Sequence, residues 1–140
     1  MNQMAKPVTH HEALIYAMVT LSAADRTMTD MELMKIGDIL RTMPIFADFE
    51  REKLGAIAEA CGRMLRDEDG LDTVLAVIKA SLPPRLYETL YACAVEVAAA
   101  DLHVAQEELV FLQMIRDELE IDELVSAAIE RSARVRYRVM

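Results

Sequence analysis

The sequence predicts an all-α protein of six or seven helices within 140 residues. Three observations support this fold class: few helix-breaking residues, apolar residues at helical spacing, and a helical hairpin that occurs twice. Only four Gly and four Pro are present, and 54% of the residues are hydrophobic. Gly and Pro are the least favourable residues inside a helix, so their scarcity favours helices. An apolar fraction of this size is sufficient for a folded core. We therefore expect a single helical domain over residues 1–140.

Two helix starts carry the same capping signal. Thr9 is followed three residues later by Glu12, and Thr29 by Glu32. In a capping box of this spacing, the hydroxyl and the carboxylate each accept a hydrogen bond from an amide that the first helical turn leaves unpaired. A helix is therefore predicted directly after each of the two Thr residues.

Proline and glycine mark the remaining helix boundaries. Pro44 follows the second predicted helix, and Gly70 is expected to stop the third. Two prolines at 83 and 84 separate the fourth helix from the fifth. The first and fifth helices are apolar on nearly every side, which predicts that both are buried. The expected helices cover about residues 10–24, 30–42, 46–66, 72–82, 84–100, 105–119 and 122–134.

A helical hairpin occurs twice, at a shift of 76 residues. In each copy a helix ends on Ala-Asp, six residues follow, and the next helix carries Glu-Leu. This pattern predicts two pseudo-symmetric hairpins, repeat 1 at about 13–40 and repeat 2 at about 89–116, with connecting helices at about 46–82 and a C-terminal helix at about 122–134. The matching residues are Leu14, Val19, Ala23, Ala24, Asp25, Glu32, Leu33 and Ile39 in the first copy, and Leu90, Val95, Ala99, Ala100, Asp101, Glu108, Leu109 and Ile115 in the second.

Each predicted hairpin has two carboxylates at its bend. Asp25 and Glu32 flank the first bend, and Asp101 and Glu108 flank the second. Hard divalent cations such as calcium or magnesium prefer carboxylate and carbonyl oxygens, and the last carbonyls of a helix are unpaired. These four residues are therefore the candidate metal ligands, and a divalent cation is the only cofactor expected. We expect two separate sites, one at each hairpin.

A purely structural role is open for the same carboxylates. An Asp just past a helix accepts hydrogen bonds from its own turn, and a Glu at the third helical position caps the helix start. In the second copy Ala105 stands where Thr29 stands in the first, so the capping box is lost while Glu108 is retained. The sequence leaves both interpretations open.

The charge distribution bears on the kind of partner. The chain has 24 acidic and 15 basic residues, a net charge of -9, and residues 131–140 hold four Arg and no acidic residue. Nucleic acid is not an expected partner, because binding to phosphates depends on Lys and Arg. A basic protein suits the acidic body better. Met28, Met31 and Met34 follow helical spacing beside the first bend and are expected in the core, with an adaptable contact patch as the alternative.

The chain is expected in the cytoplasm. Cys61 and Cys93 lie singly within apolar helical patterns, as reduced core thiols do. The sequence has no export signal at its start and no run of the roughly 18–20 apolar residues that cross a bilayer. The basic residues at 134–138 can lie on an anionic membrane or fold onto an acidic patch, although a helix end with a frayed terminus is the plainer interpretation.

The duplicated Ala-Asp motif, with Glu seven positions after the Asp, resembles the TerB-like family. This family comprises bacterial tellurite-resistance proteins of the TerB type and the N-terminal domain of DjlA-type co-chaperones. The resemblance implies an all-helical domain with acidic patches suggested to bind metal ions, and with membrane-associated or stress-response partners. The four candidate ligands match the acidic positions of the motif. The family often has Gly directly after the Asp, where this chain has Arg26 and Leu102.

Taken together, the residues and the resemblance predict a non-enzymatic acidic binding module. No phosphate-binding glycine loop, nucleophile elbow or Cys-His signature is present in the sequence. The module would hold a divalent cation at its two acidic bends. The alternative is an interaction domain whose acids only shape the bends and which docks a basic or membrane-associated protein. Tellurite itself is a poor ligand, because it is an oxyanion and the chain is strongly acidic.

Overall fold

The computed structural model describes residues 6–23, 28–101 and 106–140. Within these ranges the chain forms seven α-helices and no strand, which confirms the all-α prediction. None of these helices combines the length and the hydrophobicity needed to cross a membrane. The helices are α1 (His10–Ser22), α2 (Asp30–Leu40), α3 (Leu54–Leu65), α4 (Gly70–Ser81), α5 (Tyr87–Ala100), α6 (Gln106–Glu118) and α7 (Glu123–Arg136), with short 3-10 turns η1 (Pro44–Phe46), η2 (Arg51–Lys53) and η3 (Pro84–Leu86).

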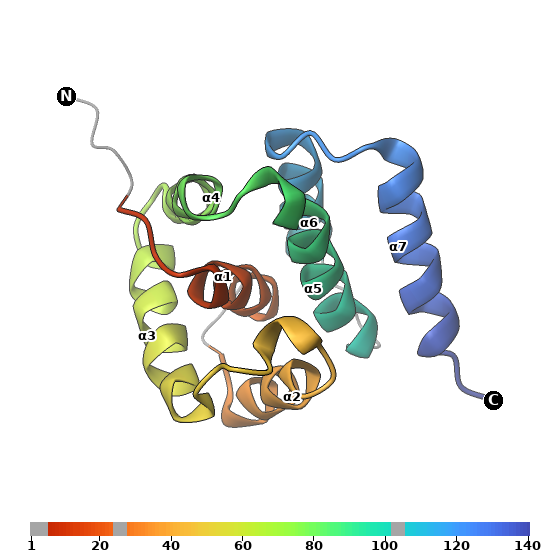
Figure 1. The fold of residues 1–140 in the computed structure, drawn as a ribbon, viewed down its shortest axis with the longest axis horizontal. Coiled ribbons are helices and arrows are strands. Elements are labelled where there is room, and N and C mark those ends of the chain that lie inside the picture. The colour runs from red at the N-terminus through yellow and green to blue at the C-terminus, as the bar shows by residue number, and fades with distance from the viewer. Residues whose placement is uncertain (1–5, 24–27, 102–105) are drawn as a thin grey trace.

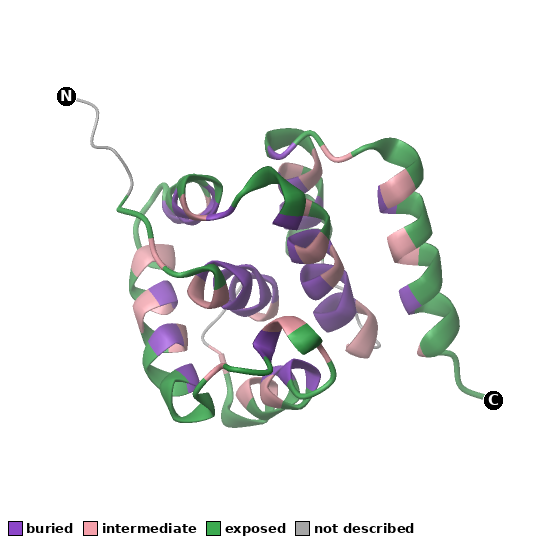
Figure 2. Cartoon of the chain, in the orientation of Figure 1, coloured by how far each residue is buried: buried purple, intermediate pink, exposed green. Residues whose placement is uncertain are grey.

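Helix α1 lies in the middle of the molecule, as Figure 1 shows, and packs against α3, α4 and α5. Every residue from Ala13 to Leu21 is buried, and Figure 2 shows that α1 is enclosed along most of its length. A helix that is apolar all round has to be enclosed by other helices. Cys61 and Cys93 are both buried and free, as expected.

The two predicted hairpins are α1–α2 and α5–α6. The shift of 76 residues carries Asp30, the first residue of α2, onto Gln106, the first residue of α6. Both capping boxes are present: the Thr9 amide donates to Glu12 Oε1 at 2.9 Å, and the Thr29 amide donates to Glu32 Oε1 at 2.8 Å. The second helices of the two hairpins therefore begin at equivalent positions, as the repeat predicts.

The third helix begins later than predicted. Its start was expected at residue 46, but the chain forms η1 and η2 first, and α3 begins at Leu54. The Ala47 amide donates to Pro44 O and the Phe49 amide to Phe46 O, which is the three-residue pattern of 3-10 turns. Glu50 is extended (φ -81°, ψ 107°) and interrupts the helix. The spacing of Phe46 and Phe49 is compatible with both kinds of helix, so the apolar pattern did not distinguish them.

Gly70 starts a helix and does not stop one. It is the first residue of α4, and it is buried against the end of α3. A Cβ atom at this position would lie 2.7 Å from Leu65 Cα and 2.8 Å from Met64 O. The expectation of a helix stop was therefore wrong: Gly is needed here because the backbones of α3 and α4 approach too closely for a side chain.

Two Gly→Ala substitutions should have opposite effects on stability. Gly70→Ala should lower the free energy of unfolding by about 1–3 kcal/mol, because backbone atoms must shift to admit the methyl group. Gly62→Ala, within α3, should raise it by about 0.5–1 kcal/mol, because nothing lies within 4 Å of the added Cβ and Ala favours the helix. Urea denaturation of both variants measures the difference. Equal effects of the two substitutions would contradict this account of Gly70.

Candidate functional site

Three of the four predicted carboxylates lie in the described part of the chain. Glu32 is in the first turn of α2, Glu108 is in the first turn of α6, and Asp101 directly follows α5. Asp25 lies outside the described residues. The three described carboxylates come from both hairpins, and all three line a single pocket.

This acidic pocket, as we call it, has a volume of about 240 Å³. Ser22, the last residue of α1, and Ala100, the last residue of α5, both line it. The ends of the two equivalent helices therefore meet at one place. The expectation of two separate sites is wrong for Glu32, Asp101 and Glu108, because the packing of α1 against α5 brings the two hairpins to the same pocket.

The lining of the acidic pocket is mixed in polarity. Besides the three carboxylates, the described lining residues include Ser22 and Thr29, which carry hydroxyls, and Lys35, which carries a cationic group. Glu108 is only 8% exposed, so its carboxylate lies in an environment where charge needs compensation. The remaining wall is largely apolar and includes Ile36, Ile39 and Val97. Oxygen donors beside an apolar wall suit a cation better than an anion.

The capping role predicted as one alternative is observed for Glu32. Its Oε1 accepts hydrogen bonds from the amide and the hydroxyl of Thr29, at 2.8 and 3.1 Å. Each of Glu32, Asp101 and Glu108 has a partner within the chain, so a ligand in the pocket would compete with existing contacts.

The donor atoms at the pocket meet part of what a metal ion requires. Carboxylate and hydroxyl oxygens are the right donor type for calcium or magnesium. Across residues 6–23, 28–101 and 106–140, however, no group of three His, Cys, Asp or Glu side chains is arranged to hold a metal ion. The described side chains thus offer the oxygen donors that a divalent cation prefers. A full set of ligands needs further donors, and Asp25 is the remaining predicted ligand.

Two methionines beside the acidic pocket are exposed. Met31 lines the pocket and is 69% exposed, and Met34, one turn further along α2, is 70% exposed. Met28 is partly buried against the core. The core placement expected for all three residues is therefore wrong for Met31 and Met34, because α2 buries only Ile36, Ile39 and Leu40.

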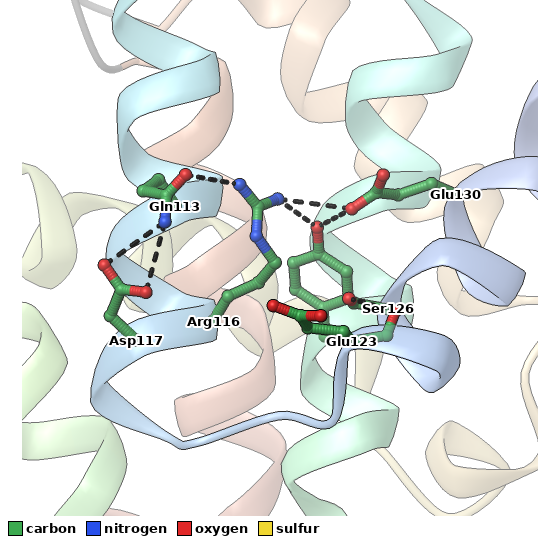
Figure 3. Close-up of polar contacts among 7 residues, drawn as sticks. Gln113, Arg116, Asp117, Glu123, Ser126 and Glu130 are labelled. Carbon is green, nitrogen blue, oxygen red and sulfur yellow. Dashed lines mark hydrogen bonds and ion pairs between the residues drawn. The ribbon is translucent and has the colours of Figure 1, made fainter.

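A polar network that the sequence did not suggest joins α7 to α5 and α6. Arg116 Nη1 donates to Tyr91 Oη at 2.7 Å and to Glu130 Oε2 at 3.2 Å, and Tyr91 also donates to Glu130. Figure 3 shows the Arg116 guanidinium between Gln113 on one side and Glu130 on the other. Burial, together with the hydrogen bond to Glu130, raises the pKa of Tyr91 to about 12, so this phenol stays protonated and donates.

A second polar network holds the end of α7. Both terminal nitrogens of Arg136 donate to the Glu96 carboxylate, at 2.7 and 3.0 Å, and Tyr137 Oη donates to it at 2.7 Å. The hydrogen bonds from Arg136 lower the pKa of Glu96, although burial opposes this shift. Of the interpretations of the basic C-terminal residues, folding onto an acidic group is therefore observed for Arg136.

Only weak sequence signals pointed to these two networks. Glu96 is one of two charged residues in α5, a helix that is otherwise almost wholly apolar, and it is just 9% exposed. A buried carboxylate needs a charged or hydrogen-bonding partner. That partner lies 40 residues away in the chain, in the Arg-rich end. Neither local spacing nor the repeat related the two residues.

The chain matches a known protein family. A family model described as "Tellurite resistance protein TerB" matches residues 11–131. The match includes both hairpins and ends within α7. Searches of curated proteins and of solved structures returned no match.

Replacing Glu96 by Gln should remove a pH-dependent part of the stability. The pKa of Glu96 is lowered from 4.5 in the folded protein, so its carboxylate stabilises the fold above that ordinary value, and this contribution is lost as the pH falls through the lowered pKa. The difference in unfolding free energy between the wild type and Glu96→Gln should be largest at neutral pH and should decrease in acid. Urea denaturation over a pH series measures it.

The matched control is Glu88→Gln, which changes an exposed carboxylate on the same helix. Its difference from the wild type should be small and should vary little with pH. A Glu96→Gln difference that stays constant from neutral to acid pH would contradict the role assigned to this carboxylate.

Proposed function

Because the chain belongs to the tellurite resistance protein TerB family, we propose that it is a binding module whose acidic pocket takes a divalent cation, calcium or magnesium. One observation carries this proposal: Glu32, Asp101 and Glu108, contributed by both hairpins, line the same pocket. Asp25 is the fourth proposed ligand. We propose binding and not catalysis, since the sequence has no recognisable catalytic motif.

The character of the pocket supports a hard cation over other ligands. Among the described residues, three carboxylates and one ammonium group, that of Lys35, line the pocket, so its described lining carries an excess of negative charge. Its hydroxyls are also hard oxygen donors, while the two free thiols of the chain lie buried in the core. Soft metals prefer thiolate ligands, whereas calcium and magnesium prefer oxygen. The two buried free thiols also support our placement of the protein in the reducing cytoplasm.

Titration of the labelled protein with calcium or magnesium, followed by amide NMR, tests the proposal. In the wild type, amide signals of residues around the acidic pocket should shift and reach saturation. Asp101→Asn with Glu108→Gln should weaken the apparent affinity at least about tenfold, because the donors lose their charge. Glu118→Gln, at the far end of α6, serves as the matched control and should bind as the wild type does.

Two outcomes would overturn the cation proposal. The first is an absence of saturable shifts around the pocket at millimolar metal. The second is an equal loss of affinity in the Glu118→Gln control, which would indicate non-specific attraction to the acidic surface. Urea denaturation of each variant establishes that the fold is retained.

We propose docking of a basic protein segment, including one on a membrane-associated partner, as a second candidate function. The exposed pair Met31 and Met34 favours it, because these side chains lie on the helix that supplies Glu32 and Lys35 to the acidic pocket. Exposed Met side chains adapt to varied apolar partners. A segment with a basic residue beside an apolar one would match both features.

A synthetic amphipathic peptide of Lys and Leu is a suitable probe for this second function. Met31→Ser with Met34→Ser should weaken its binding at least about tenfold, because two apolar contacts are lost. Leu124→Ser, which changes a residue that is 82% exposed on α7, is the control and should have no effect. Fluorescence anisotropy of the labelled peptide measures both. Unchanged binding in the double Met variant would contradict docking at this surface.

A further inference from the structure

Helix α7 is attached to the rest of the protein in a different way from the other helices. Only two of its residues, Ser126 and Ala133, are buried, and both are small, while Ile129 is partly buried against the core. By contrast, α1 is buried at nine successive positions, from Ala13 to Leu21. Figure 2 shows α7 as a largely exposed helix at the edge of the molecule. Apolar burial therefore contributes less to holding α7 in place than to holding α1.

An open groove of about 540 Å³ lies beside the contact between α7 and α5. Small residues line it, among them Ala92 on α5 and Ala128 and Ser132 on α7, and so do Glu96 and Arg136. The polar contact between Glu96 and Arg136 therefore borders a surface that is open to solvent.

Polar contacts also hold α7, at two places along the helix. Near its middle, Glu130 accepts hydrogen bonds from Tyr91 and Arg116. At its end, Arg136 and Tyr137 donate to Glu96 on α5. The Glu96 side chain is 11% exposed and Arg136 is 51% exposed, so water reaches one side of this ion pair.

These polar contacts make separation of the two helices less costly than separation of two apolar faces. When α7 moves away, the Glu96 carboxylate and the Tyr91 hydroxyl can be solvated by water, and neither is left unpaired in an apolar environment. A helix face that carries such polar groups can be exposed to water at a lower cost than an apolar face. The contact between α1 and α5 differs, because α1 packs buried apolar residues against its neighbours.

The second network also lies beyond the family match. That match ends at residue 131, inside α7, whereas Arg136 and Tyr137 follow it. The residues that attach the end of α7 to α5 therefore lie outside the part of the chain that matches the family model.

We propose that α7 is a latched helix, which opens away from α5 as a unit while α1 to α6 stay folded. The two polar networks are the latch, and opening exposes the face of α5 that carries Tyr91 and Glu96. The population of the open form is set by the strength of these contacts, because local opening has its own free energy, smaller than that of global unfolding. The device is independent of any ligand at the acidic pocket.

Hydrogen exchange of the full chain, read residue by residue, tests the latch. Arg136→Ala should speed exchange of the α7 amides at least about tenfold, because hydrogen bonds to a charged group are lost. Tyr137→Phe, a milder change, should speed it in the same direction. The amides of α1 should exchange as in the wild type. Arg134→Ala is the matched control, since Arg134 is exposed in the same last turn.

The outcomes separate the proposal from its alternatives. Faster exchange in α7 alone, in Arg136→Ala and Tyr137→Phe but not in Arg134→Ala, supports the latch. Unchanged exchange in α7 overturns it, because the polar contacts then do not hold the helix. A parallel rise in α7 and α1 also overturns it, because α7 would then open only when the whole protein unfolds.

Discussion

The enclosure of α1 is the constraint on which the rest of the structure depends. Its stretch from Ala13 to Leu21 has no polar face, so it is stable only with helices on all sides. Helices α3, α4 and α5 supply those sides. The position of α5 beside α1 has functional consequences, because it brings described carboxylates of both hairpins to the same pocket.

The acidic pocket follows directly from that packing. The described part of the first hairpin supplies Glu32, and that of the second supplies Asp101 and Glu108. Because α1 packs against α5, Ser22 and Ala100 line the same pocket as these three carboxylates. Concentrated negative charge attracts cations more strongly than dispersed charge does. The duplication therefore has its effect in the tertiary structure, since it brings carboxylates from both hairpins to one pocket.

Two kinds of attachment coexist in this fold. The central helices are held by apolar burial, which is cooperative and is lost only with the fold. Helix α7 is held largely by hydrogen bonds and ion pairs to Tyr91 and Glu96. Polar contacts of this kind can exchange with water one at a time. The molecule thus combines a rigid body that carries the acidic pocket with an edge helix whose attachment depends on a few side chains.

The sequence by itself determined the helices, their caps and the duplicated hairpin, because these depend on hydrogen bonds and apolar spacing within a few residues. It was wrong at Gly70, where the close approach of α3 and α4 decided the backbone conformation, and at the start of α3, where the apolar spacing fits 3-10 turns as well as a helix. Only the tertiary structure decided that carboxylates of both hairpins share one pocket and that Arg136 reaches Glu96. Both depend on how helices far apart in the chain pack, and local sequence patterns do not encode that geometry.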